Sequence, residues 1–340
     1  NKEQGTRNKE QENLPMLSVI IPHFNRSRLV RETIASVKVQ TRGDWEILLV
    51  DDGSSPEERA ALDSLAEERI RVLDRVDGEK GPSRCRNLGA DAARGEFLLF
   101  LDSDDLLGPT CFVDRLEAAE NEPDFDLWVF PAGTFVETPG DSEQLWGTMD
   151  LNRNDAERFA GGDAPWHTSS PLWRSAAFRD LGGFNERILY GDDADLHLRA
   201  LLVPLRIRQF PDRAADIFVR RSDEARITNT LDDTLLHSRR VRLEEGNRLL
   251  REPKIPLRLR EIWEGQHLVE AEFLLFRNRE RADIESVLSL WRDAYSPPTL
   301  RRLIVTSYVQ FALLTRNRAY LLLRLARRLA IAVLPRAYFP

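Results

Sequence analysis

Three carboxylates are crowded into four residues where Asp102-Ser103-Asp104-Asp105 follows the apolar run 97–101. Carboxylates repel one another and cost free energy to desolvate, so this grouping indicates a bound cation. A short uninterrupted apolar run is typical of a strand that is buried on both faces. Ligands of open α/β sheets bind at the carboxyl ends of such strands. The sequence therefore predicts a cation site here, and the alternative is an acidic turn that caps the next helix.

Two earlier apolar runs also end in polar residues. The run 17–21 is followed by Pro22-His23-Phe24-Asn25, and the run 45–50 is followed by Asp51-Asp52-Gly53. Because the carboxyl ends of parallel strands meet at one edge of a sheet, these two loops and the loop 102–105 should lie side by side. The sequence thus predicts one site that is formed by three loops.

Helical patterns separate these strands. One helix is expected over about 28–40, another from Pro56 to about 68, and a third from about 82 to 93. The alternation of strand and helix with short links predicts an α/β fold of the doubly wound type. Its sheet should be mostly parallel, with helices on both faces.

The pattern changes beyond about residue 230 to long charged segments that are typical of helices. These helices are expected over about 231–250, 257–277, 280–294 and 299–334. We therefore expect three parts in the chain: a disordered tail at 1–15, a catalytic domain at 16–229 and an α-helical region at 230–340.

The composition excludes several classes of protein. A net charge of −7 argues against a nucleic-acid partner. Two cysteines, Cys85 and Cys111, cannot form a disulfide framework and lack zinc-site spacing, which favours a reducing, cytoplasmic location. We find no apolar run of about 18 residues, so no membrane-spanning helix is expected.

The C-terminal residues 300–340 hold eight arginines and neither Asp nor Glu. Arg324, Arg327 and Arg328 share one face of the expected helix, and leucines fill much of the remainder. One interpretation is a helix that packs on the catalytic domain with a solvated basic face. The other is an interfacial helix that contacts anionic lipid.

A second acidic group begins a helix that is expected to reach about residue 202. Asp192 and Asp193 stand in its first turn, where the helix dipole alone would favour them. A positioned carboxylate can also act as a general base. His23, His167 and His197 lack metal-ligand spacing and are expected to be packing or polar surface residues.

An aromatic pair, Trp166 and His167, precedes this helix in a loop. Aromatic rings in such a loop can offer a ligand a stacking face, whereas Trp173 is expected in the core.

Together these segments resemble glycosyltransferase family 2, the inverting, metal-dependent enzymes with the GT-A fold. The resemblance covers about residues 17–228. It rests on the following motifs in this order: Val19-Ile20-Ile21-Pro22-His23-Phe24-Asn25, Val50-Asp51-Asp52-Gly53-Ser54, Arg86-Asn87-Leu88-Gly89, the run 95–105, Gly182-Gly183-Phe184, and Asp192-Asp193 with Asp195, Leu196 and Arg199.

The resemblance implies a role for each matching residue. Asp193 would be the catalytic base, and Asp104 would bind the Mn²⁺ or Mg²⁺ ion. The nucleotide-sugar donor would be contacted by Pro22, Phe24, Asn25, Asp52, Arg86, Asp102 and Ser103. Asp52 would accept a hydrogen bond from the base, and Asp102 would bind the ribose. Trp166, His167 and Asp192 would be further contacts to donor or acceptor.

Three assignments stay open on the residues alone. Asp52 could instead belong to an Asp-Gly turn, and Asp51 could equally be the buried member of that pair. Asp192 could be the catalytic base or the structural partner of Asp193. Arg86 could contact the donor phosphates or serve as an internal counter-ion for the strand-end carboxylates.

Two further points concern residues in or near these motifs. Asp105 is expected only to begin the next segment. The family's Arg-x-His motif is altered here to Arg220-Arg221-Ser222.

The function expected from this resemblance is transfer of a single sugar from a nucleotide-diphosphate sugar to an acceptor hydroxyl. The acceptor would be a sugar or a lipid-linked sugar in bacterial surface-polysaccharide or glycolipid synthesis. The protein would be cytoplasmic, with peripheral contact to the inner face of the cell membrane through 300–340. The Gln-x-x-Arg-Trp motif of processive members is absent, which disfavours a polymerase.

Other functions were weighed against this one. A sugar nucleotidylyltransferase would need a glycine-rich phosphate loop where this chain has Pro22-His23-Phe24-Asn25. A dehydrogenase would need Gly-x-Gly-x-x-Gly after a strand, which is missing. A non-catalytic sugar-binding or scaffold protein would fit the altered loop at Arg220, but not the intact carboxylates.

Overall fold

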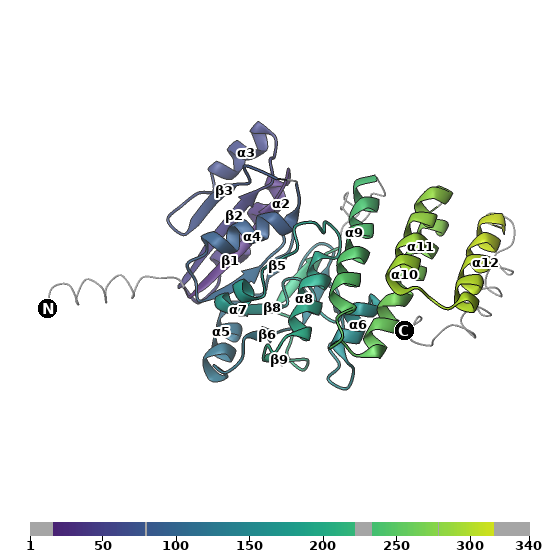
Figure 1. The fold of residues 1–340 in the computed structure, drawn as a ribbon. Helices are drawn as coiled ribbons and strands as arrows, with labels where there is room; N and C mark the ends of the chain where they lie inside the picture. The colour runs from purple at the N-terminus through teal and green to yellow at the C-terminus, as the bar shows by residue number, and fades with distance from the viewer. Residues whose placement is uncertain (1–15, 79, 222–232, 278, 316–340) are drawn as a thin grey trace. The chain divides into compact units, whose positions relative to one another are not determined.

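The computed structural model describes residues 16–78, 80–221, 233–277 and 279–315 (Figure 1). The expected tail at 1–15 and the arginine-rich segment from 316 onward lie outside these residues. The chain divides into two compact units. The first holds the residues up to 152 together with 165–229, and the second holds 153–164 together with the residues from 230 onward. The domain limits that the sequence predicts stay a prediction.

A seven-stranded sheet forms the first unit, with strand order β3-β2-β1-β4-β8-β6-β9. The strands β1, β2, β3 and β4 are mutually parallel, whereas β8 runs antiparallel to β4 and β6. The strands span β1 Leu17–His23, β2 Trp45–Asp51, β3 Ile70–Asp74, β4 Phe97–Phe100, β6 Leu127–Val129, β8 Pro171–Arg174 and β9 Ile207–Gln209. The predicted α/β fold with a mostly parallel sheet is confirmed, and its first strands lie side by side in Figure 1.

Helices connect these strands as the sequence predicts. The helices of this unit are α2 Ser27–Lys38, α3 Pro56–Asp63, α4 Pro82–Ala92, α5 Cys111–Asn121, α7 Ser175–Asp180 and α8 Asp192–Leu202. Pro56 opens α3, and the Ser55 hydroxyl accepts a hydrogen bond from the Glu58 N–H at 3.3 Å. This helix ends at Asp63, earlier than the residue 68 that the sequence indicates.

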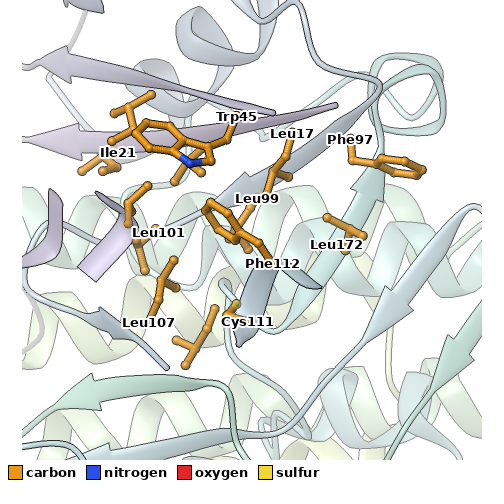
Figure 2. Packing of buried hydrophobic residues seen from close by; sticks show 14 of the residues in the cluster. Leu17, Ile21, Trp45, Phe97, Leu99, Leu101, Leu107, Cys111, Phe112 and Leu172 are labelled. Carbon is orange, nitrogen blue, oxygen red and sulfur yellow. The ribbon is translucent and has the colours of Figure 1, made fainter. Parts of the chain in front are cut away.

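The core of the first unit lies between the sheet and α5. Leu17 and Leu99 come from the neighbouring strands β1 and β4, and Phe112 comes from α5; all three are buried (Figure 2). Phe112 lies beside Leu99 in this cluster, and its truncation to Ala would cost about 3–5 kcal/mol. The apolar strands thus fix the sheet edge from which the polar loops emerge.

A small three-stranded sheet, which the sequence does not predict, follows the acidic loop. It has the order β5-β10-β7, with β5 Leu106–Leu107, β7 Ala132–Phe135 and β10 Ile217–Arg220. The strand β10 is antiparallel to β5 and parallel to β7. The loop 102–105 is therefore anchored by β4 of the large sheet before it and by β5 of the small sheet after it.

The second unit is helical, as predicted for the region after 230. Its helices are α6 Asp155–Gly161, α9 Asp233–Leu250, α10 Leu257–Phe276, α11 Arg281–Tyr295 and α12 Thr299–Thr315. None of the helices among the described residues is long and apolar enough to cross a membrane.

Three buried carboxylates of α10 each accept hydrogen bonds from a different neighbouring helix. Glu264 accepts from the Trp291 Nε1–H of α11 at 3.0 Å. Glu270 accepts from Arg239 of α9 at 2.5 and 2.8 Å. Glu272 accepts from the Tyr308 hydroxyl of α12 at 2.6 Å. Because a buried carboxylate needs its partners, these bonds fix the helices to one another.

Candidate active site

The loops after β1 and β2 interlock at the carboxyl edge of the sheet. The Asn25 N–H donates to the Ser54 hydroxyl at 2.9 Å, and the Ser55 N–H donates to Asn25 Oδ1 at 2.8 Å. Asn25 has a φ of 50°, in the left-handed region that Asn tolerates better than most residues. The structure thus brings together the first two polar loops that the sequence places at one edge.

Asp51 and Asp52 have different surroundings. Asp51 Oδ2 accepts from the N–H groups of Gly53 and Ser54 at 3.2 and 3.0 Å, so this carboxylate shapes the turn. Asp52 Oδ1 instead accepts from Arg75 Nε at 2.5 Å. The turn-forming role therefore falls to Asp51, which leaves Asp52 as the candidate contact to a nucleotide base.

Arg75 was not singled out by the sequence reasoning. It follows β3 directly, so the strand-end rule that identified the other loops could have found it. Beside it Phe24 is 43% exposed, with the Lys80 Nζ 4.4 Å from its ring centroid. An exposed aromatic face at this edge offers a surface on which a base can stack.

Arg86 joins two of the acidic segments. Its Nη2 donates to Asp102 Oδ1 at 2.6 Å, and its Nη1 donates to Asp192 Oδ2 at 2.7 Å. The Ser83 hydroxyl also donates to Asp192 Oδ2, at 2.8 Å. Arg86 and Asp192 are both buried. Arg86 is thus paired with both carboxylates in this structure, which is the arrangement expected of an internal counter-ion.

Two glycines position the helices that carry this network. A Cβ on Gly89 of α4 would approach Ile20 Cγ2 to 2.5 Å, so glycine lets α4 lie close against β1. Gly191 has a φ of 73° immediately before α8, which turns the chain into the helix at Asp192. Arg86 and Asp192 meet because both helices start at this edge.

Asp193 differs from its neighbour in its electrostatic surroundings. The pKa of this half-buried carboxyl is raised to about 6. Desolvation is the largest cause, and the adjacent Asp192 charge raises the pKa by more than the Arg86 charge lowers it. A carboxylate whose pKa lies near neutrality is suited to accept a proton at physiological pH.

The acidic loop after β4 is held by two arginines. Asp104 Oδ2 accepts from Arg26 Nη1 at 3.1 Å. Asp105 Oδ1 accepts from the Arg220 N–H at 3.0 Å, and Arg220 Nε donates to the Asp104 carbonyl at 2.9 Å. Asp105 is buried, so it does more than begin the next segment as expected. Ser103 is also buried between these carboxylates.

One atom each from Asp102, Asp105 and His167 lies within 4.8 Å of the others, which is the spacing of a metal-ligand group. The carboxylates fit a Mg²⁺ or Mn²⁺ ion, because such hard cations prefer oxygen ligands. The imidazole does not fit in its observed arrangement. Its Nδ1 accepts from the Ser169 N–H at 3.3 Å, so a neutral ring carries its proton on Nε2, 3.9 Å from Asp102 Oδ2.

A pocket of about 140 Å³ adjoins His167 on the side of the small sheet. Trp166 is buried in its wall, whereas Trp173 is buried in the core, as predicted for that residue. The pocket is lined by Phe130, Pro131, Ala132, Leu145, Gly147, Thr148, Met149, Pro165, Trp166, His167, Ser170 and Pro211.

The other two histidines pack inside the unit, as the sequence predicts. The His197 ring lies 5.8 Å from Trp166 and 6.3 Å from Trp173, and burial lowers its pKa to about 3. His23 is also buried, and burial lowers its pKa. In the altered Arg-x-His motif, Arg220 and Arg221 are described, and Ser222 lies outside the described residues.

Comparison with known proteins decides the family. The sequence pattern of the family described as "Glycosyl transferase family 2" matches residues 18–173. This chain carries a family 2 glycosyltransferase domain. The matched residues include β1, β2, β4 and the acidic loop 102–105, so the resemblance seen in the motifs is confirmed.

Solved structures with this fold include two that were determined with a nucleotide sugar bound. TarS residues 1–349 from S. aureus, solved in complex with UDP-GlcNAc, align with a TM-score of 0.66 at 16% identity. That alignment covers 92% of this chain and 91% of TarS 1–349. The mannosyltransferase PcManGT from Pyrobaculum calidifontis, in complex with GDP-Man and Mn²⁺, aligns with a TM-score of 0.52 at 16% identity over 94% and 86% of the two chains. At these identities the likeness shows the shared GT-A fold.

Relatives in sequence are named glycosyltransferases. The chain is 40% identical over 96 residues to a Campylobacter jejuni protein named GalNAc(5)-diNAcBac-PP-undecaprenol beta-1,3-glucosyltransferase. It is 37% identical over 210 residues to EpsJ of Bacillus subtilis, named an uncharacterized glycosyltransferase. The alignments cover 28% and 58% of this chain, and they span 31% and 60% of those relatives' lengths.

Proposed function

We propose that this family 2 domain is an inverting glycosyltransferase that moves a single sugar from a nucleotide-diphosphate sugar to an acceptor hydroxyl. One observation carries the proposal. Asp193, with a pKa raised to about 6, follows the residue that Arg86 ties to the acidic loop of β4. The proposed proton acceptor is therefore the next residue in sequence to Asp192, which Arg86 joins to the candidate donor-binding carboxylate of Asp102.

Asp193 is the general base in this proposal. The attacking hydroxyl loses its proton to the carboxylate as it displaces the nucleoside diphosphate from the anomeric carbon. A positioned base of this kind contributes about 10²–10⁴-fold to the rate. A single displacement from the opposite face inverts the anomeric configuration. Arg86 holds the Asp192 side chain in place through a hydrogen bond of 2.7 Å, so in this proposal the two neighbouring carboxyl groups have different roles.

A divalent ion is the proposed cofactor. When bound, Mg²⁺ or Mn²⁺ would neutralise charge on the leaving diphosphate. The loop carboxylates of Asp102, Asp104 and Asp105 would hold it, with Asp104 as the ligand that the family resemblance implies. Asp104 already binds a cation, the Arg26 guanidinium at 3.1 Å, which supports a site built for positive charge. The structure of PcManGT with GDP-Man and Mn²⁺, which has the same fold, adds to this support.

The donor would lie across the interlocked loops. Asp52, paired with Arg75, and the exposed Phe24 are the proposed contacts to the base. Pro22, Asn25, Arg86, Asp102 and Ser103 remain proposed contacts to the nucleotide sugar. Neither the base nor the sugar is assigned by these residues.

The acceptor is proposed to be a lipid-linked sugar. The Campylobacter jejuni relative and an Escherichia coli relative, 36% identical over 91 residues, are both named for undecaprenol-linked acceptors. A peripheral position at the inner face of the cell membrane, through 300–340, would suit such an acceptor. Flotation of the full-length protein with anionic liposomes tests this, and protein that stays at the bottom of the gradient contradicts it.

The enzymatic proposal is tested with a panel of nucleotide sugars, each with and without Mn²⁺. Donor binding is scored by thermal shift, and nucleoside diphosphate release is scored with sugar acceptors present. We expect one donor to stabilise the protein and to be consumed, and to do so better with the metal. If no donor binds under any metal condition, the non-catalytic scaffold interpretation replaces this one.

A further inference from the structure

Arg220 of β10 contacts the acidic loop through both its backbone and its side chain. Its Nε donates to the Asp104 carbonyl at 2.9 Å, and its Nη2 donates to Glu32 Oε2 of α2 at 2.7 Å. Its backbone N–H donates to Asp105 Oδ1 at 3.0 Å. The guanidinium carbon also lies 4.6 Å from the centroid of the Phe135 ring. Because Arg220 is only 9% exposed, these contacts hold its side chain in one position.

The helix α2 supports the same stretch of backbone at two points, one helical turn apart. The Ser36 hydroxyl of α2 accepts from the Leu107 N–H of β5 at 3.1 Å. Glu32, four residues earlier and on the same face of α2, is joined to the Asp104 carbonyl by Arg220. The backbone from Asp104 to Leu107 is therefore attached to α2 at both ends, and Arg220 supplies the attachment at the candidate metal ligand.

Two arginines act on different atoms of Asp104. Arg26 Nη1 donates to the carboxylate oxygen Oδ2 at 3.1 Å, so it takes a place that a metal ion would need. Arg220 Nε donates to the carbonyl oxygen instead. A hydrogen bond to the carbonyl orients the residue and leaves the carboxylate to other partners. The Asp104 side chain is 16% exposed, so an ion in solution can reach it.

We propose that Arg220 is a positioning residue for the metal ligand Asp104. It acts on the backbone of Asp104, and Glu32 holds its guanidinium in place. The inference rests on the proposed function in one respect, that Asp104 binds a divalent ion. Partners that orient metal ligands by hydrogen bonds matter for affinity, and their loss typically weakens metal binding about 10–100-fold.

The sign of the effect separates positioning from simple electrostatics. Arg220 carries a positive charge close to a site for a cation, so its charge alone would oppose metal binding. On that basis its removal would tighten the binding of Mn²⁺. A positioning role predicts the opposite result, because a loop that is released from Arg220 must lose conformational freedom when the metal binds.

Titration of the full chain with Mn²⁺, with no nucleotide present, tests this sign. Electron paramagnetic resonance of free Mn²⁺ measures the dissociation constant. Arg220→Met keeps an apolar side chain of similar length but removes the guanidinium donors. It should raise the Mn²⁺ dissociation constant about tenfold. An unchanged or lower dissociation constant overturns the proposal.

Glu32 offers a second variant at a more exposed side chain, 40% of which is accessible. Glu32→Ala removes the acceptor of Arg220 Nη2 and should raise the Mn²⁺ dissociation constant about threefold. Glu32→Gln keeps a carbonyl acceptor at this position, so it should recover most of the parent's affinity. Equal losses in the two variants would show that Glu32 acts by its charge, which contradicts its role in holding Arg220.

Hydrogen exchange of the metal-free chain gives a readout that does not depend on the ion. The Asp105 N–H donates to the Asp102 carbonyl at 3.1 Å, and this amide and that of Leu107 should exchange faster in Arg220→Met. Weaker Mn²⁺ binding with unchanged exchange in this loop would overturn the positioning role.

Arg221→Met is the matched control for Arg220→Met. Arg221 is the next residue in sequence, is exposed, and donates to Gln144 rather than to the acidic loop. Its replacement should change neither the exchange of the loop nor the affinity for Mn²⁺. Thermal unfolding verifies that each variant is folded.

The outcomes separate this inference from the proposed function. Mn²⁺ binding that Asp104→Asn abolishes, but that Arg220→Met and Glu32→Ala leave unchanged, overturns the inference while the proposed metal site stands. A parent chain that binds no Mn²⁺ contradicts the metal site itself, and the positioning of its ligand with it. Weaker binding in Arg220→Met and Glu32→Ala, with recovery in Glu32→Gln, supports the proposal.

Discussion

Arg86 donates a hydrogen bond of 2.7 Å to Asp192, while Asp193, the next residue of α8, keeps a pKa raised to about 6. The carboxyl groups of Asp192 and Asp193, which the sequence alone cannot distinguish, therefore have different surroundings. A carboxylate that is hydrogen-bonded to a buried guanidinium is held in one position, which suits a structural role. Its neighbour, desolvated and next to a like charge, accepts a proton more readily.

Replacement of Asp193 tests the proposed base. Asp193→Asn should lower kcat about 10²–10⁴-fold, because the amide cannot take the proton of the attacking hydroxyl. The dissociation constant of the donor should stay unchanged, since the donor is held by the loops of β1, β2 and β4. Initial rates and calorimetric titration with the donor measure the two quantities.

Replacement of Asp104 tests the proposed metal ligand. Asp104→Asn should lose metal-dependent donor binding. Asp212→Asn, at an exposed residue of a surface loop, should change neither kcat nor the dissociation constant of the donor. Full activity in both Asp193→Asn and Asp104→Asn would contradict the assigned roles of these carboxyl groups.

The pH dependence of the reaction should report the same group. Asp193 is active as the carboxylate, so kcat/KM should rise from pH 5 to pH 7 with an apparent pKa of about 6. An ordinary carboxyl group would place this limb near pH 4. A rate that is flat from pH 5 to pH 7, with donor and metal saturating, would exclude Asp193 as the base.

The raised pKa also predicts an effect on stability. The pKa rises from 3.8 to about 6 on folding, so between these values the folded chain binds more protons than the unfolded chain. Stability from this group is therefore complete below pH 3.8 and is lost as the pH rises through 6. An amide does not ionise, so Asp193→Asn avoids this loss of stability at high pH. The free energy of unfolding of the variant at pH 8 should therefore exceed that of the parent by roughly 2–3 kcal/mol. Urea unfolding at pH 5 and pH 8 measures this, and a gain that is equal at both pH values would contradict it.

Replacement of Arg86 decides between its two proposed roles. Arg86→Met leaves Asp192 buried without its counter-ion, so it should reduce the free energy of unfolding by about 3–5 kcal/mol. An arginine that only contacted donor phosphates would instead lose donor affinity with unchanged stability. Arg84→Met is the control from the same helix, because Arg84 pairs with Asp77 and Glu186 at the surface. It should leave the free energy of unfolding nearly unchanged, because ion pairs at the surface contribute little to stability.

The strands and the site edge were predictable because their signals are local. Apolar runs such as 97–101 mark buried strands, and the polar residues that follow them mark the ligand edge. The small sheet was not predictable, since β5 has two residues and β10 four, and short strands carry no periodicity. Only pairing over a long sequence separation creates them.

Several site contacts were missed for the same reason. Arg26 and Arg220 hold the acidic loop although both are distant from it in sequence. Arg26 lies 78 positions from Asp104, to whose carboxylate it donates, and Arg220 lies 116 positions from Asp104, to whose carbonyl it donates. By contrast, the sequence narrowed the candidate base to Asp192 or Asp193, and the hydrogen bond from Arg86 to Asp192 favours Asp193.

The ion pair between Arg26 and Asp104 predicts competition with the metal. The Arg26 guanidinium occupies Asp104 Oδ2 at 3.1 Å, so a divalent ion must displace it. Arg26→Ala should therefore tighten Mn²⁺ binding in the absence of donor, by about two- to fivefold for a partly exposed pair. Electron paramagnetic resonance of free Mn²⁺ measures the affinity. Arg31→Ala is the control, because Arg31 lies on α2, the helix that follows Arg26, and donates to Ala61 and Ser64 instead. Weaker Mn²⁺ binding in Arg26→Ala alone would show that Arg26 assists the metal.

Truncation of the chain tests the predicted boundary at 229. The short helix α6 falls before this boundary in sequence, yet it belongs to the helical unit. Gln266 of α10 donates to the Gly161 carbonyl at 3.0 Å, and Arg258 pairs with Glu157 at 2.8 Å. A chain of residues 16–229 keeps α6 but loses α10, so the apolar face around Phe159 becomes exposed. We expect this chain to bind an apolar dye such as ANS and to aggregate.

A second truncated chain isolates the cause. Replacing 153–164 by a Gly-Ser segment of equal length within 16–229 removes α6 together with its apolar face. If α6 belongs with the helical region, this replacement should restore solubility and a single unfolding transition, because the sheet keeps all of its own contacts. If residues 16–229 instead unfold at the same temperature as the full chain, without dye binding, then α6 is stabilised by the catalytic domain alone. The boundary at 229 would in that case separate two domains that fold independently.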